Sequence, residues 1–263
     1  MYKFLLAMLV PALGAAESLW ELGLGAGALV VPDYRGSNQT RAYAVPMPYV
    51  IYRGEVFKMD RDGLRAQLLA STGMALDISA AGSFPVNSEK NEARKGMPNL
   101  GGSVELGPSL NVNLWTSGSN KLELRLPVRA VITAGKGQGI DYNGLVFTPR
   151  LNIDFKNIAG WDYGSYVGLN FADKRHHDYF YTVSPLYATS TRKAYEAKAG
   201  YGGASWVAGM SRRIDKVWVG AFVRADSLHG ASFSDSPLVK SKTAFYGGLG
   251  FAYVFYESGE HSK

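Results

Sequence analysis

Apolar and polar residues alternate with a period of two along most of this chain. In the segment 121–134, leucine, valine, alanine or isoleucine stands at every even position from 122 to 132, and charged residues stand at 121, 123, 125 and 129. Successive side chains of a strand point to opposite faces, so such a segment has one apolar and one polar face. The pattern recurs along the chain and predicts an all-β fold.

We predict about ten strands from this alternation, and twelve are possible. The ten lie near 20–31, 42–53, 64–80, 100–115, 121–134, 144–156, 163–172, 194–212, 216–227 and 242–256. Two further strands, at 55–59 and 177–183, would make twelve. Most of the segments exceed the roughly 5–6 residues of an average strand, whereas a tilted strand that crosses a bilayer needs about 9–11.

Soluble sandwiches and lipocalin-like barrels also show this alternation. The lengths of the connections, and the charges of both signs on the polar faces, favour a membrane barrel over them. Short gaps at 116–120, 157–162 and 213–215 alternate with long ones at 32–41, 81–99, 135–143, 173–193 and 228–241. Short periplasmic turns and long external loops are typical of outer-membrane barrels. Because lipid offers no hydrogen-bond partners, the sheet must close on itself. We therefore expect a single closed antiparallel transmembrane β-barrel.

The first sixteen residues resemble a secretory signal peptide. Lys3 is followed by an apolar run from Phe4 to Leu13, and Gly14-Ala15-Ala16 supplies the small residues of a cleavage site. We expect cleavage before Glu17, which leaves one barrel domain over 17–263.

Composition narrows the class of protein further. The 263 residues include no cysteine, which excludes disulfide scaffolds, thiol catalysis and zinc-thiolate sites. Beyond the first dozen residues there is no apolar run of about 18, as an ordinary transmembrane helix requires. Charged residues make up 19% of the chain, against about 25% in a typical soluble domain.

Charged residues on the polar faces are the candidate lumen residues. They are Glu105, Glu123, Arg125, Arg129, Arg150, Asp154, Arg224 and Asp226. Buried charges must pair or remain hydrated, so they form either a salt-bridged lumen that fills a narrow barrel or the charged constriction of a pore. We favour the filled lumen, because about ten strands enclose little spare space.

The chain offers little sign of catalysis, of a metal or of a cofactor. His176, His177 and Asp178 with Ser184 are the one cluster that suggests an enzyme, but no nucleophile motif surrounds Ser184. Adjacent histidines on a strand would point to opposite faces, which disfavours a shared metal. The glycine-rich pieces lack the lysine of a P-loop. We expect no enzyme, no cofactor and no metal site.

Basic residues in the long connections predict an outer surface that pairs with lipopolysaccharide phosphates. They are Lys136, Lys174, Arg175, Arg192, Lys193, Lys240 and Lys242. Nucleic-acid binding is not expected, because the chain lacks a suitable fold or helix.

Several motifs, in their order along the chain, resemble those of a known family. Pro32-Asp33-Tyr34-Arg35-Gly36-Ser37 is the most specific of them. The others are Pro46 to Gly54, Leu106-Gly107-Pro108, Leu126-Pro127-Val128-Arg129, Tyr195 and Gly200-Tyr201. Together they resemble the MipA/OmpV family of Gram-negative outer-membrane proteins. The motif residues carried over are Pro32, Asp33, Tyr34, Gly36 and Ser37.

The resemblance implies a non-enzymatic scaffold in the outer membrane. The name-giving member is an MltA-interacting protein, which is thought to tether a murein lytic transglycosylase to a murein synthase. Other members are described as adhesins or antigens. The leading hypothesis is therefore a scaffold for murein-remodelling enzymes, and the alternative is a small-solute pore or a surface adhesin.

Overall fold

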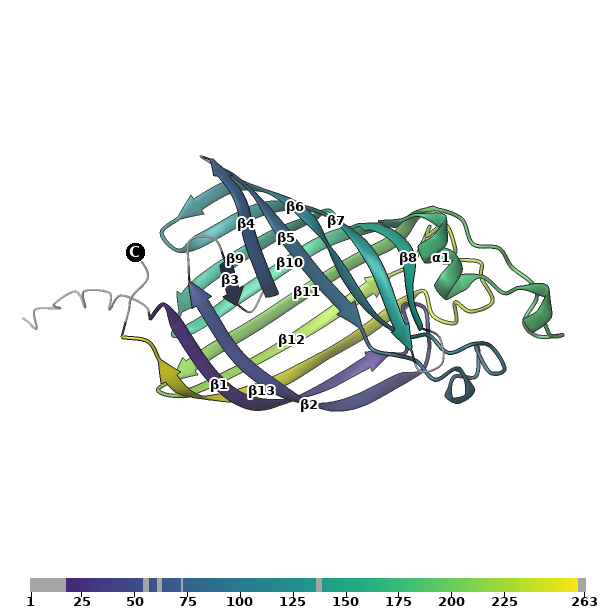
Figure 1. The fold of residues 1–263 in the computed structure, drawn as a ribbon, viewed down its shortest axis with the longest axis horizontal. Coiled ribbons are helices and arrows are strands. Elements are labelled where there is room, and N and C mark those ends of the chain that lie inside the picture. The colour runs from purple at the N-terminus through teal and green to yellow at the C-terminus, as the bar shows by residue number, and fades with distance from the viewer. Residues whose placement is uncertain (1–17, 54–56, 61–62, 72, 136–138, 260–263) are drawn as a thin grey trace, which may run out of the picture.

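One large antiparallel sheet makes up most of the molecule (Figure 1). The computed structural model describes residues 18–53, 57–60, 63–71, 73–135 and 139–259, and their side chains outside the range 52–70. The strands are β1 (Trp20–Pro32), β2 (Thr40–Arg53), β3 (Phe57–Asp60), β4 (Gly63–Ser71), β5 (Met74–Ser83), β6 (Gly102–Ser117), β7 (Asn120–Gly135), β8 (Gly139–Phe147), β9 (Arg150–Ile158), β10 (Trp161–Ala172), β11 (Gly200–Ile214), β12 (Val217–Ser227) and β13 (Thr243–Glu257). The helical elements are η1 (Ser88–Lys90), α1 (Lys174–Tyr181) and η2 (Pro185–Tyr187).

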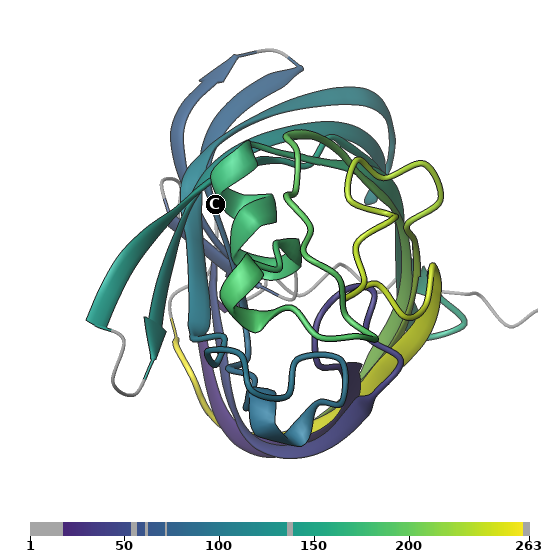
Figure 2. The same cartoon turned by 90° about the vertical axis from the view of Figure 1, so that its right-hand side faces the viewer.

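The strand pairings run round the molecule and return to their start. Each strand pairs with the next along the chain from β1 to β8, and β13 pairs with β1. Both β8 and β9 pair with β7 on one side and with β10 on the other, so they are one pass interrupted at Thr148-Pro149. Proline has no N–H for the ladder, which accounts for the interruption. Figure 2 shows the resulting barrel from the end that carries α1.

The all-β prediction is confirmed, and most of the expected strands are present. The expected strand 64–80 is instead two strands, β4 and β5, because the chain reverses near Gly73, whose φ is +88°. β3 overlaps the expected strand 55–59 from residue 57 and ends one residue later, at Asp60; residues 55 and 56 are outside the described residues. The expected strand 177–183 is wrong, since most of this segment belongs to α1.

Three two-residue turns and the four longest connections lie at opposite ends of the sheet (Figure 1). The three turns are 118–119, 159–160 and 215–216. They contain residues with positive φ, such as Gly118 (+58°) and Asp215 (+51°), as tight hairpins require. The long segments 33–39, 84–101, 173–199 and 228–242 lie at the other end.

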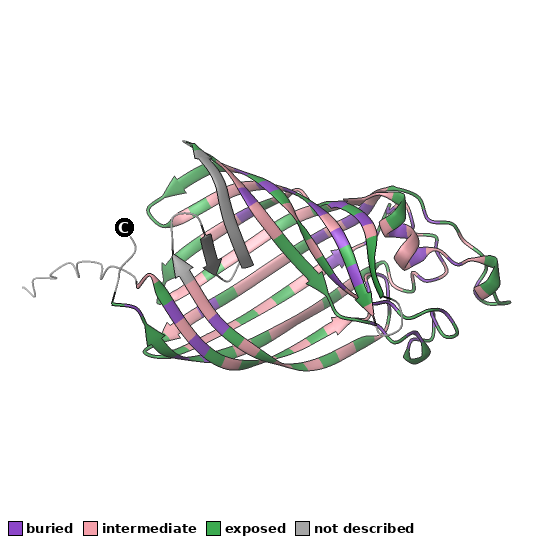
Figure 3. Ribbon diagram, viewed as in Figure 1, coloured by how far each residue is buried: buried purple, intermediate pink, exposed green. Residues whose placement is uncertain are grey.

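The outward face of the sheet is apolar: exposed residues alternate with less exposed ones along the strands (Figure 3), and many of the exposed side chains are large and apolar. Val104 is 61% exposed, Val223 54% and Phe245 76%. Other exposed apolar side chains of this face are Leu24, Leu106, Val128, Ile132, Val167 and Phe251. A water-soluble domain rarely exposes so large a contiguous apolar surface. Within the described part of the chain, no helix is long and apolar enough to cross a membrane.

In the part of the chain that the structure describes, β2 pairs along nearly its whole length with one neighbouring strand but only at its end with the other. β2 pairs with β1 from Thr40 to Tyr52. With β3 it pairs only at Tyr52 and Arg53, and no other strand partner is recorded on that edge among the described residues. Pro46 and Pro48 stand in this stretch. Proline is tolerated in a strand where its missing N–H faces no neighbour.

Candidate functional site

The four long segments fold together into a compact layer over one mouth of the barrel, which we call the cap (33–39, 84–101, 173–199 and 228–242; Figure 2). The cap has its own hydrophobic core, in which Tyr181 and Phe233 stack with ring centroids 3.6 Å apart. Phe233 and Val183 are each 1% exposed, and Leu238 is fully buried. Further buried members are Tyr34, Val86, Met97, Leu100, Ala197, Leu228 and Ala231. Burial on this scale holds the segments in place over the mouth.

The family motif at the end of β1 ties the first of these segments to the last. Pro32 closes β1, and the Tyr34 hydroxyl donates to the Leu238 carbonyl oxygen at 2.7 Å. The Gly36 carbonyl oxygen accepts from the backbone N–H groups of Lys240 at 2.7 Å and Ser241 at 3.0 Å. The φ of Gly36 is +99°, which favours glycine at this position. Burial raises the pKa of Tyr34 to about 12, so its hydroxyl stays protonated.

The same motif holds the segment 84–101 through Asn91, which is 1% exposed. The Asn91 amide donates to an Asp33 carboxylate oxygen at 2.8 Å and to the Ser37 hydroxyl at 3.2 Å. The Arg41 guanidinium donates to both carboxylate oxygens of Asp33. The motif therefore connects the segments 84–101 and 228–242 of the cap by hydrogen bonds.

Arg35, inside the motif, connects the cap to the barrel wall. Its guanidinium donates to the Gly202 carbonyl oxygen at 2.9 Å and lies 3.5 Å from an Asp226 carboxylate oxygen. The Tyr181 hydroxyl donates to the Arg35 carbonyl oxygen at 2.9 Å. Alternation along the sequence places Asp226 on the lumen face. It does not predict the contact of Asp226 with Arg35, because Arg35 lies between strands, where the sequence does not alternate.

The two adjacent histidines belong to α1 and serve the packing of the cap. The Asp173 carboxylate caps the helix by accepting from the His176 N–H at 2.9 Å. His177 is 2% exposed, and its Nδ1 lies 2.6 Å from the Lys198 carbonyl oxygen. Burial lowers the pKa of both histidines, that of His176 to about 4. The Ser184 carbonyl oxygen accepts from the Tyr187 N–H at 3.0 Å. Within the described part of the chain, no hydrogen bond joins Ser184 to either histidine, and no three side chains that could ligate a metal come together.

One of the expected surface cations is a buried structural residue instead. Arg192 is 9% exposed, and its guanidinium donates to the carbonyl oxygens of Tyr187, Ala93 and Lys95. This makes it a link between two cap segments, so the prediction of an exposed basic side chain is wrong there. Lys136 lies outside the described residues.

Ion pairs connect most of the charged residues that alternation placed on the lumen face. The Arg129 guanidinium donates to Glu105 at 3.0 Å, to the Ser79 hydroxyl at 3.3 Å and to the Thr148 hydroxyl at 3.0 Å. The four residues come from strands β5, β6 and β7 and the break between β8 and β9. Arg129 is 7% exposed, so it depends on these partners.

The other charged residues that alternation placed on the lumen face form two further ion-paired groups and a contact between a cation and an aromatic ring. Arg125 lies 2.7 Å from Glu123 and 4.0 Å from Asp154. The Arg224 guanidinium lies 3.0 Å from the Asp226 carboxylate. The Arg150 guanidinium stands over the Tyr166 ring, 4.9 Å from its centroid.

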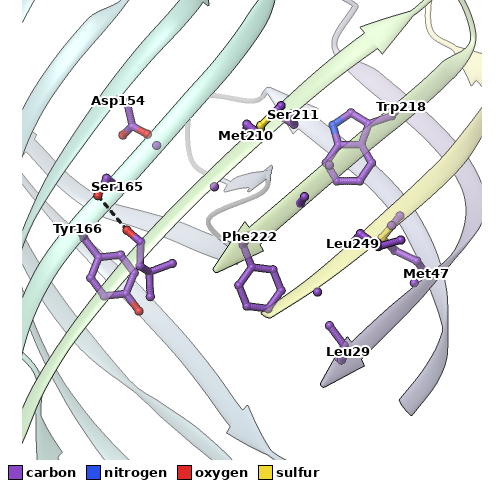
Figure 4. Close-up of a pocket in the computed structure, with 18 of the residues that line it drawn as sticks. Leu29, Met47, Asp154, Ser165, Tyr166, Met210, Ser211, Trp218, Phe222 and Leu249 are labelled. Carbon is purple, nitrogen blue, oxygen red and sulfur yellow. Dashed lines mark hydrogen bonds between the residues drawn. The ribbon is translucent and has the colours of Figure 1, made fainter. Parts of the chain in front are cut away.

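A cavity of about 450 Å³ remains in the lumen beside these charges. Figure 4 shows its lining from opposite walls of the barrel. Apolar side chains of β1, β2 and β12 form one wall, namely Leu29, Val45, Met47, Trp218 and Phe222. Polar side chains of β9 and β10 form the other, namely Arg150, Asn152, Asp154 and Tyr166. The sequence-based predictions do not include apolar side chains that line part of the lumen. Alternation along β1 and β2 does show which of their residues face inward.

The comparisons with known proteins point to one family. The family model of the MltA-interacting protein MipA matches residues 24–255. No curated protein matches this chain. A solved structure of the CymD monoaromatic hydrocarbon channel is similar at 10% identity, over 92% of this chain and 90% of that one, with a TM-score of 0.39. The Pseudomonas putida toluene transporter TodX is similar at 10% identity, over 92% of this chain and 69% of that one, with a TM-score of 0.30. Because the family match spans most of the sequence, the chain belongs to the MipA family.

Proposed function

We propose that this protein is an outer-membrane β-barrel that anchors murein-remodelling enzymes, a lytic transglycosylase of the MltA kind and a murein synthase, at the membrane. The observation that carries the proposal is the family match to the MltA-interacting protein over residues 24–255. The protein acts without catalysis of its own, and residues 1–16 serve as its export signal.

The outward face of the sheet supports a place in the membrane. Exposed apolar side chains such as Val104, Val223 and Phe245 suit contact with lipid, whereas the charges of the lumen are paired. Proteins of the outer membrane span the bilayer with strands that have one apolar and one polar face.

The cap supports an anchor in preference to an open pore. The cap lies across one mouth of the barrel (Figure 2), and ion pairs such as Arg129–Glu105 and Arg224–Asp226 occupy part of the lumen. An open channel needs a continuous water-filled path.

The end with the short turns then faces the periplasm and the murein. Its docking surface consists of the turns 118–119, 159–160 and 215–216 and the strand ends beside them. Arg213 of β11 pairs there with Glu21 of β1 and with Glu257 of β13, so one side chain connects three strands at this rim. The segment 54–56 and the tail 260–263 lie outside the described residues.

Crosslinking in intact cells, followed by pull-down of the tagged protein and mass spectrometry, tests the anchor. We expect a lytic transglycosylase and a murein synthase among the recovered proteins. Lys121→Glu with Lys216→Glu, at the turn end, should reduce that recovery several-fold, because both lysines are exposed beside the proposed docking surface.

The matched control is Lys193→Glu with Lys240→Glu, which makes the same charge change on exposed lysines of the cap. It should leave recovery unchanged. Recovery of neither enzyme from wild-type cells, or equal losses in both double variants, would contradict the anchor.

A second candidate is a small-solute pore, which the lumen cavity of about 450 Å³ favours. Ion conductance in planar bilayers separates it from the anchor. An adhesin role would depend on the cap, so attachment to host cells or surfaces unchanged by the Lys193→Glu and Lys240→Glu double variant would argue against it. Lipopolysaccharide phosphates are the proposed neighbours of the exposed cap lysines.

A further inference from the structure

The apolar wall of the lumen is not explained by contact with lipid. Leu29, Met47 and Phe222 point into the barrel (Figure 4), whereas lipid contacts the outward residues of the same strands. The inward face of a membrane barrel is ordinarily polar. These side chains also leave a cavity beside them, so packing of the lumen does not account for them.

Glycines in the wall let the apolar side chains lie flat and keep the cavity open. A Cβ at Gly248 would stand 2.4 Å from a Leu29 methyl carbon, and one at Gly250 would stand 3.1 Å from the Met47 sulfur. A volume of about 450 Å³ falls within the range of small-molecule sites, roughly 300–1,000 Å³.

The opposite wall offers a hydrogen-bond acceptor. Asn152 is 7% exposed, and its Oδ1 has no hydrogen-bond partner among the described residues. Buried polar atoms of native proteins are nearly always paired. An N–H or O–H group of a bound molecule would satisfy this one.

From these observations we propose that the lumen cavity binds a small, largely apolar molecule, about the size of two or three aromatic rings, that carries one hydrogen-bond donor. Its apolar body lies against Leu29, Met47 and Phe222, and its donor faces Asn152. The site goes beyond the anchor proposed above and does not depend on it.

N-phenyl-1-naphthylamine is a suitable probe, because it is apolar, has one N–H and fluoresces in apolar surroundings. We would titrate it into the protein in lipid nanodiscs and subtract the signal of empty nanodiscs. We expect saturable one-to-one binding. Asn152→Leu should weaken it about 3–10-fold, as the loss of one hydrogen bond implies. The N-methyl analogue, which lacks the donor, should bind wild type and Asn152→Leu equally.

Val45→Trp fills the cavity and should abolish saturable binding. Its matched control is Val223→Trp, which makes the same change on the outward face, where Val223 is 54% exposed. Val207→Phe repeats the filling from β11, so one misfolded variant does not decide the result. Heat-modifiable migration on gels verifies the fold of each. Binding no different from that of empty nanodiscs, or binding unchanged by both filling variants, would overturn the proposal.

Discussion

Asp226 on β12 is held by four side chains. Its oxygens lie 3.5 Å from Arg35 and 3.0 Å from Arg224, and they accept from the Ser205 hydroxyl at 2.6 Å and from the Tyr246 hydroxyl. The side chain is 2% exposed. It therefore joins a cap segment to three strands of the wall.

Asp226→Asn should destabilise the protein by about 3 kcal/mol, because it leaves two guanidinium groups near each other without their carboxylate. Urea unfolding of the protein refolded into liposomes measures this. Lys156→Gln is the control, since the Lys156–Asp162 pair is 40% and 35% exposed and is worth about 0.5 kcal/mol or less. Equal costs for the two variants would contradict the role of Asp226.

Alternation along the sequence predicts which charged side chains share a face but not which of them pair. Glu123 and Arg125 are two positions apart on β7, so their contact follows from strand geometry. The contact of Arg129 with Glu105 depends on the register of β6 against β7. Arg35 reaches Asp226 from a segment without any periodic pattern.

Among the elements, the cap is stabilised by its own core. Phe233→Ala should cost about 3–5 kcal/mol by removing a side chain that is 1% exposed and stacked on Tyr181. Because the loss falls on the cap, limited proteolysis should cut 173–199 and 228–242 first, while the barrel stays resistant.

Leu186→Ala is the control for that change, since Leu186 lies in the same layer but is 82% exposed. It should leave the digestion pattern unchanged. If Phe233→Ala digests like the wild type, the cap does not depend on its core.

The cap should also loosen in mild acid, because burial lowers the pKa of His176 to about 4. An unfolded histidine titrates near pH 6.5. The opened cap therefore binds a proton at pH values where the closed cap does not, so its stability is full above about pH 7 and falls as the pH drops from about 6.5 to 4. The shift corresponds to about 3 kcal/mol at most.

Hydrogen exchange of cap amides between pH 7 and pH 4, corrected for intrinsic rates, measures this effect. His176→Gln removes one of the two buried histidines with a lowered pKa and should make the profile less steep, while Asp173 and His177, which keeps its own share of the acid response, remain in both proteins. Parallel profiles for the variant and the wild type would show that other groups set the acid response.

The aromatic residues of the segment 177–183 explain why the sequence predicts a strand where the structure has a helix. Tyr179, Phe180 and Tyr181 favour a strand by propensity. Asp173 nevertheless caps a helix that starts at Lys174, and the aromatic residues pack in the cap core rather than in a sheet. Tertiary contacts of this kind carry no short-range signal.

For the whole molecule, the sequence predicts the class of fold well and the strand number approximately. Among the described residues, thirteen strands form twelve passes when β8 and β9 are counted as one, whereas alternation predicts ten with twelve possible. The difference comes from the turn near Gly73 and from the short strand β3. The cap could not be predicted, since it depends on contacts among four segments distant in sequence.

The measurement that tests the account most directly is the ion conductance of residues 17–263 refolded into planar bilayers. The account treats the protein as a capped anchor, so it predicts no conductance above that of the empty bilayer, at a protein density where heat-modifiable migration confirms folding. A steady, reproducible channel conductance from the folded wild-type protein would contradict it and favour the pore.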